Sequence, residues 1–116
     1  MALKSKVIIS WILSGILALA YIGAGSSKLI GADSQIKNLQ GWGYPLWSLY
    51  PIGIIEIGLA IGILIPGFRK ITIYGIFLWT IAAVVTHLQA GQASFIGAPI
   101  LFGVVAAVIL LLSREK

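Results

Sequence analysis

The sequence predicts an all-α fold, an antiparallel bundle of four transmembrane helices, and two features predict it. The first is composition: 59% of the 116 residues are hydrophobic and only 9% are charged, against roughly 25% charged residues in soluble domains. The second is the presence of four long apolar runs, since about 17–25 such residues cross a bilayer as a helix. We therefore expect one multi-pass domain over residues 1–116, in the inner or plasma membrane.

Each apolar run has bounds that can be set from the sequence. The predicted helices are residues 7–30, 46–65, 71–88 and 95–113. The second is long enough only if it begins near Leu46, where Pro45 suits a first helical turn. The first follows Lys4 and Lys6 as a signal peptide would, but it is longer than a signal core of ~7–15 residues. We therefore expect a retained helix.

The connections predict how the helices are arranged. Helices two and three are joined by Pro66–Lys70, and helices three and four by Gln89–Ser94. Connections this short indicate antiparallel neighbours. The longer connection, Gly31–Tyr50, is rich in Trp and Tyr, which favour the headgroup level of a membrane. We expect it to lie on the outer interface, with a short amphipathic helix around Ile36 and Leu39.

Basic residues predict the orientation of the chain. In a four-span arrangement one side receives Lys4, Lys6, Arg69, Lys70, Arg114 and Lys116. By the positive-inside rule that side is the cytoplasm, so both termini are predicted to be cytoplasmic. The formal charge of +5 comes from cations at helix ends and not from one basic face, so we expect no nucleic-acid partner.

Three readily ionisable residues lie within the predicted spans: Lys28, Glu56 and His87. Such groups cost about 2.5–3.5 kcal/mol or more at the bilayer centre and are functional candidates for that reason. At about 1.5 Å per residue, Lys28 lies roughly 30 Å and His87 roughly 24 Å from the inner ends of their helices, and Glu56 roughly 8 Å below the outer end of its own. We therefore predict a polar pocket in the outer half of the membrane. A snorkelling Lys28, a structural ion pair at Glu56 and a satisfied interface histidine are the alternatives.

Helical phase adds residues to these positions. Residues three, four and seven apart share a helix face, so Tyr21 and Gly25 lie on the face of Lys28 and are predicted to bind the ligand with it. On the other side of the second helix, Gly58 and Gly62 form a GxxxG pair, which predicts close packing against a third helix or a second subunit.

Several kinds of site are excluded or poorly supported. The chain has no cysteine, so it offers no disulfide, thiol redox pair or thiolate metal site. One His and one Glu fall short of the three protein ligands of catalytic zinc, so we predict no metal site. No phosphate-binding loop is present, and no nucleophile elbow supports a triad of Ser26 or Ser27 with His87. Any redox role needs a borrowed cofactor, and enzymatic activity stays an open question.

Three stretches resemble, in order, the DoxX-like family of small four-helix membrane proteins. They are YIGAGSSKLIG (Tyr21–Gly31), YPIGIIEIGLAIGILIPG (Tyr50–Gly67) and AAVVTHL (Ala82–Leu88). The resemblance covers nearly the whole chain. It implies a four-span bundle with a pocket at one membrane face, and it singles out Gly25–Leu29, Glu56 and His87. The family name comes from a membrane subunit of a thiosulfate:quinone oxidoreductase, and other relatives are linked to oxidative-stress complexes or to receptor assembly.

These observations leave three hypotheses for function. In the first, the pocket binds a small hydrophobic or quinone-like molecule and assists a membrane oxidoreductase. Lys28 or His87 then bonds a carbonyl-like oxygen, and Glu56 holds or exchanges a proton. In the second, the chain is a structural subunit or assembly chaperone of a larger membrane complex. In the third, it is a proton-coupled transporter acting as a homo-oligomer, which the apolar inner halves of the helices disfavour.

Overall fold

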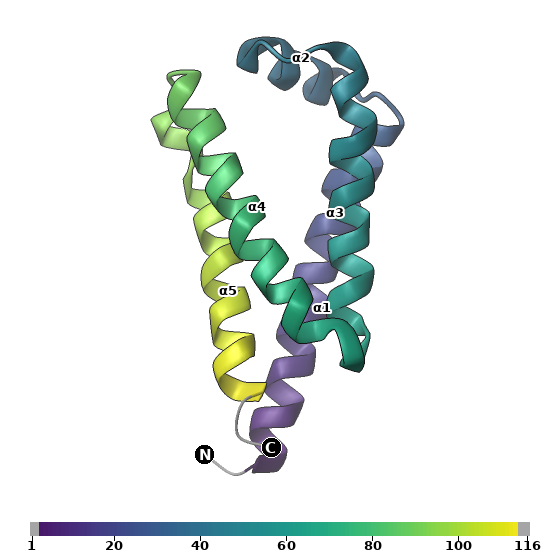
Figure 1. Ribbon diagram of the computed structural model, residues 1–116, viewed down its shortest axis with the longest axis vertical. Coiled ribbons are helices and arrows are strands. Elements are labelled where there is room, and N and C mark those ends of the chain that lie inside the picture. Colours follow the sequence, from purple (N-terminus) through teal and green to yellow (C-terminus); the bar gives the residue numbers. More distant parts are fainter. Residues whose placement is uncertain (1–2, 114–116) are drawn as a thin grey trace.

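The computed structural model describes residues 3–113, and over that range every element is a helix (Figure 1). The long helices are α1 (Leu3–Leu29), α3 (Leu49–Leu64), α4 (Arg69–Gln89) and α5 (Gly97–Ser113). With the short 3-10 turns that precede three of them, four helical segments are long and apolar enough to cross a membrane: Lys4–Leu29, Leu46–Leu64, Pro66–Gln89 and Ala93–Ser113. The all-helical fold with four spans is therefore confirmed. Arg114 and Lys116, used above to orient the chain, lie outside the described residues.

Prolines set the starts of two spans. The 3-10 turn η1 (Leu46–Ser48) follows Pro45 and runs into α3, so the second span begins at Leu46. The turn η2 (Pro66–Phe68) runs into α4, so the third span begins before residue 71. The connection predicted at Pro66–Lys70 is therefore largely helical. Its proline has the fixed φ that suits a first helical turn, and no later residue breaks the helix.

The loop between the first two spans contains α2 (Asp33–Trp42), at the place where a short amphipathic helix was predicted. Gly31 precedes it with a φ of 68° and Gly43 ends it with a φ of 78°, a left-handed conformation that glycine adopts without strain. Leu39 of α2 is fully buried. In Figure 1, α2 lies across one end of the bundle, and α1 begins and α5 ends at the other. We call these the α2 end and the terminal end.

The closest contacts between the long helices lie at glycines. A Cβ atom added at Gly25 of α1 would lie 2.7 Å from the carbonyl oxygen of Gly53 in α3, and one added at Gly53 would lie 2.8 Å from that of Gly25. This contact holds α1 and α3 together close to the α2 end. Nearer the terminal end, Gly62 of α3 lies directly against Thr72 of α4. From there α3 and α4 diverge towards the α2 end (Figure 1).

The apolar core fills the half of the bundle nearer the terminal end. Its fully buried members come from all four long helices: Leu17, Ala60, Ile63, Ile73, Ile76, Ala106 and Ile109. Arg69, which the sequence placed in a polar turn, is also buried there. Its Nη2 donates to Ser14 Oγ (2.9 Å), and its guanidinium lies 4.2 Å from the ring centre of Trp11. Among residues 3–113, the other half of the bundle has no comparable core.

Candidate functional site

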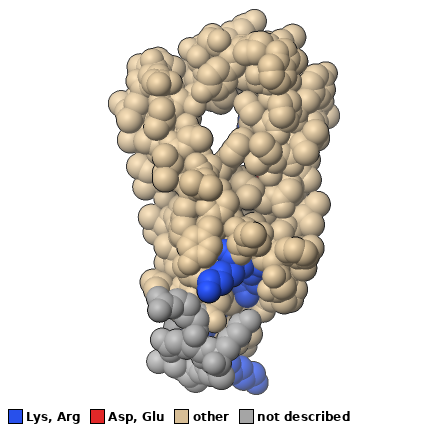
Figure 2. Space-filling view, viewed as in Figure 1, with Lys and Arg blue, Asp and Glu red and all other residues tan. Residues whose placement is uncertain are grey.

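A cavity of about 420 Å³ occupies the half of the bundle nearer the α2 end. It lies below α2, between the α1–α3 pair and the α4–α5 pair (Figure 1). The space-filling view shows an opening that passes through the molecule at this place (Figure 2). Much of the wall is aromatic, with rings from four helices and a loop: Tyr21, Trp42, Tyr44, Trp79 and Phe102. The cavity is therefore roofed by α2 and open at its sides.

A buried ion pair lies in the wall formed by α1 and α3. Lys28 Nζ and Glu56 Oε1 are 2.7 Å apart, and the two side chains are 8% and 10% exposed. Lys28 comes three residues after Gly25 in α1, and Glu56 comes three residues after Gly53 in α3. Because Cβ atoms tilt towards the start of a helix, the two side chains of these antiparallel helices lean towards each other. Lys28 therefore points into the bundle and not towards the membrane surface.

The second carboxylate oxygen of Glu56 faces the opposite wall. It accepts a hydrogen bond from Trp79 Nε1 of α4, at 3.4 Å. Below the ion pair, Tyr21 packs its ring against Phe102 of α5, with 5.3 Å between ring centres. Trp79 was not among the residues predicted from the sequence. Its position in the sequence could have indicated a role in the site, because a tryptophan in the middle of a span lies away from the membrane interfaces that tryptophan favours.

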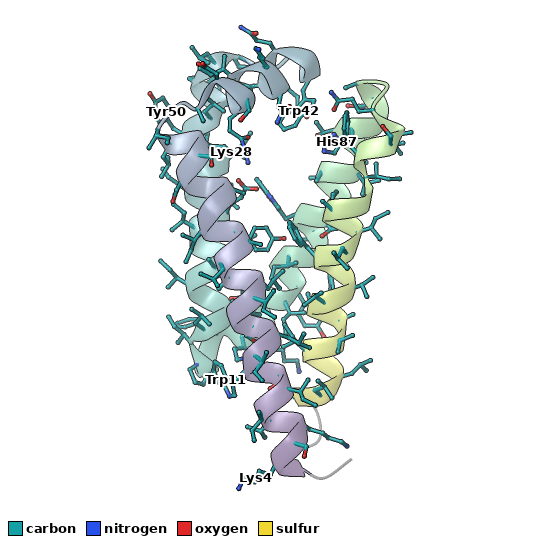
Figure 3. The ribbon with its side chains drawn as sticks, turned by 180° about the vertical axis from the view of Figure 1, so that it is seen from behind. Lys4, Trp11, Lys28, Trp42, Tyr50 and His87 are labelled. Carbon is teal, nitrogen blue, oxygen red and sulfur yellow. The ribbon has the colours of Figure 1, made fainter. Side chains whose placement is uncertain are left out.

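His87 lies across the cavity from Lys28, with Trp42 between them and nearer to the histidine (Figure 3). Its Nδ1 is 2.8 Å from Gln92 Oε1, and the same oxygen accepts a hydrogen bond from Trp42 Nε1 at 3.0 Å. The rings of Trp42 and His87 are in contact and nearly perpendicular, with 5.6 Å between centres and 85° between planes. Gln92 was also not predicted, because its only signal in the sequence is a polar, uncharged side chain in a short loop.

A second hydrogen bond connects the chain beyond α2 to α4. Tyr44 Oη and Thr86 Oγ1 are 2.7 Å apart. Together with the bond between Trp42 and Gln92, it ties the roof of the cavity to the α4–α5 pair at residues about 40 to 50 positions away in the chain. The roof is thus held at both of its ends, by the chain itself near α1 and by these bonds near α4.

The structure brings most of the sequence-predicted residues to one place. Lys28, Glu56, His87 and Tyr21 all line the cavity. Gly25, which was expected to bind the ligand, lies instead in the contact between α1 and α3, because only a residue without a side chain fits against α3 there. Of the GxxxG pair, Gly62 packs on α4, whereas a Cβ at Gly58 would meet nothing within 4 Å. Gly58 therefore has no packing role among the described residues.

The site combines a cation, a carboxylate and an imidazole with aromatic walls. Pockets of about 300–1,000 Å³ with mostly apolar walls and a few polar groups are typical of sites for small molecules. Among residues 3–113, no group of three or more His, Cys, Asp and Glu side chains could hold a metal ion. The arrangement therefore places charged and hydrogen-bonding groups beside apolar surface.

Comparison with known proteins gives one match. A family model described as the DoxX-like family matches residues 12–109 of the chain. This range contains all the cavity residues named above. No curated protein and no solved structure matches.

Proposed function

The chain belongs to the DoxX-like family, and from that premise we propose that this multi-pass membrane protein binds a small amphiphilic ring molecule of the quinone class. The ligand lies in the cavity below α2, and its binding assists a membrane oxidoreductase. The enzyme supplies the electron transfer, since the chain carries no thiol pair of its own.

The observation that carries this proposal is the position of the ion pair. Lys28 and Glu56 border a cavity of about 420 Å³, whereas a pair that only locks two helices together needs no space beside it. A ring that enters this space packs against Trp79 and Phe102. An oxygen on the ring then lies within reach of the Lys28 ammonium, which is a strong donor because it is charged.

The shape of the cavity favours a ligand that comes from the bilayer. α2 covers the end of the bundle, while the opening in Figure 2 runs sideways between the helix pairs. The outer faces of these helices carry exposed apolar side chains, among them Ile54, Leu78 and Leu101, as lipid-facing helices do. A quinone with an apolar tail can therefore place its ring in the cavity and leave the tail between the helices.

The proposal includes an orientation. We place the terminal end in the cytoplasm and the α2 end outside the inner or plasma membrane, because Lys4, Arg69 and Lys70 all lie towards the terminal end. The chain has no cysteine, so single variants can be labelled without interference. An impermeant thiol reagent should label Ser34→Cys, but not Ser5→Cys, in intact cells. The reverse pattern would contradict the orientation.

Blocking the cavity tests the binding. Ala83 lines it, and Val85 is an exposed residue of the same helix that does not. Binding of a decyl-substituted benzoquinone would be measured in lipid nanodiscs, with empty nanodiscs subtracted. Ala83→Phe should weaken it at least about tenfold by filling the space, and Val85→Phe should leave it unchanged. No binding to the unmodified protein, or equal binding to both variants, would contradict the proposal.

A further inference from the structure

The hydrogen bonds around Gln92 have directions that can be assigned from the chemistry of the three side chains. An indole N–H can only donate, so the Gln92 atom 3.0 Å from Trp42 Nε1 must be the amide oxygen. That oxygen can only accept. His87 Nδ1, 2.8 Å from the same oxygen, must therefore carry a proton. The tryptophan fixes the amide, and the amide fixes the tautomer of the histidine.

We infer that Trp42 and Gln92 hold His87 in its Nδ1–H tautomer, so that the neutral ring presents Nε2 as an acceptor. The cavity then prefers a ligand that carries a hydroxyl group, such as a hydroquinone or a related phenol, to a quinone. The protonation state of Nε2 follows from that of Nδ1, since a neutral imidazole carries one N–H only. The preference for a ligand with a hydroxyl group rests on the proposed function, whereas the tautomer of His87 does not.

The two walls of the cavity then make different demands on a ligand. Lys28 donates and can bond a carbonyl or a hydroxyl oxygen, but the Nε2 atom of His87 can only accept. A quinone oxygen that faces Nε2 brings two acceptors together and gains no hydrogen bond. A hydroquinone can receive a bond from Lys28 at one oxygen and donate its other hydroxyl to His87. The first hypothesis from the sequence had Lys28 or His87 bond a carbonyl-like oxygen. The network around Gln92 instead makes Nε2 of His87 an acceptor for a ligand hydroxyl.

The tautomer can be measured without a ligand. The chain contains one histidine, so labelling histidine with ¹⁵N gives the NMR signals of His87 alone. At a pH where the ring is neutral, we expect Nδ1 to be protonated and Nε2 to be bare. Gln92→Leu should raise the Nε2–H population, and Trp42→Phe should do the same by freeing the amide to turn. Gln92→Glu keeps an acceptor oxygen and should keep the Nδ1–H form, while Gln89→Leu, an exposed residue of α4, is the matched control. A predominant Nε2–H form in the unmodified protein, or an unchanged tautomer in Gln92→Leu, would overturn the inference.

Three probes test the preference for a ligand in the same nanodiscs: a decyl-substituted benzoquinone, its hydroquinone and the dimethyl ether of that hydroquinone. The hydroquinone should bind up to about tenfold more tightly than the other two, the effect of one added hydrogen bond. Gln92→Leu should remove this difference, so that the hydroquinone binds no more tightly than the quinone. Equal binding of all three probes would overturn the inferred preference and leave the proposed function standing. If no probe binds, the proposed function fails and the preference fails with it, whatever the tautomer.

Discussion

Replacing Lys28 by methionine would leave Glu56 buried without its cation, and it should destabilise the bundle by about 3 kcal/mol. The two charged atoms are 2.7 Å apart and both side chains are at most 10% exposed. Removing one partner of a buried ion pair costs about 3–5 kcal/mol. We take the lower value because the pair borders a cavity and Trp79 still donates to the carboxylate. At about 1.4 kcal/mol per factor of ten, the unfolding equilibrium shifts roughly 100-fold.

The double variant Lys28→Met/Glu56→Leu separates a structural role from binding. Replacing both charges by apolar side chains of similar size is often neutral, so most of the lost stability should return. Quinone binding should be lost in this variant, because the Lys28 donor is absent. Unfolding by SDS in mixed micelles, followed by circular dichroism, measures the stability. Lys37→Met, an exposed lysine of α2, is the control. The reasoning is wrong if Lys28→Met unfolds like Lys37→Met, or if the double variant still binds the quinone.

Two further substitutions, each with a control variant, test the packing that positions the cavity. Gly25→Ala places a Cβ 2.7 Å from a backbone oxygen of α3 and should destabilise by about 1–3 kcal/mol. Gly23→Ala meets nothing within 4 Å and should gain up to about 1 kcal/mol of helix propensity; equal unfolding midpoints for the two would contradict the described α1–α3 contact. Arg69→Met removes a charged hydrogen bond and a ring stack to α1, at a cost of about 2 kcal/mol. Lys70→Met, at an exposed position beside it, should change stability by less than about 0.5 kcal/mol, and a similar loss in both would refute a specific role for Arg69.

Local sequence was sufficient to predict the four spans and the short helix between the first two. Apolar length fixes a span, and the helix around Ile36 and Leu39 follows from alternation of polar and apolar residues over a few turns. Depth and helical phase also predicted that Lys28 and Glu56 belong to one region, since both depend only on distance along a helix. The start of the third span was predicted too late, at residue 71 instead of Pro66, because a proline can either end a helix or open one.

The rest of the site depends on contacts between distant parts of the chain. Trp42 and Gln92 are 50 residues apart, and Trp79 and Glu56 are 23 apart. No period along a single helix reveals such pairs. Arg69 shows the same limit, because its charge beside Lys70 indicated a polar turn, whereas its burial depends on Ser14 in α1. A sequence shows which side chains share a face, and packing decides which faces meet.

The position of the cavity follows from where the helices touch. Gly25 and Gly53 close the α1–α3 contact, and Gly62 brings α3 against α4 only near the terminal end. Beyond that point the two helix pairs separate. Trp42 of α2 bridges the gap to the loop after α4, and Tyr44, which follows α2, bridges it to α4. The buried cations at the two ends of the bundle therefore have different surroundings. Arg69 lies within helix contacts, so its role is to fasten them. Lys28, at the other end, faces open space as well as Glu56, and this difference is why we propose Lys28, and not Arg69, as the ligand-binding cation.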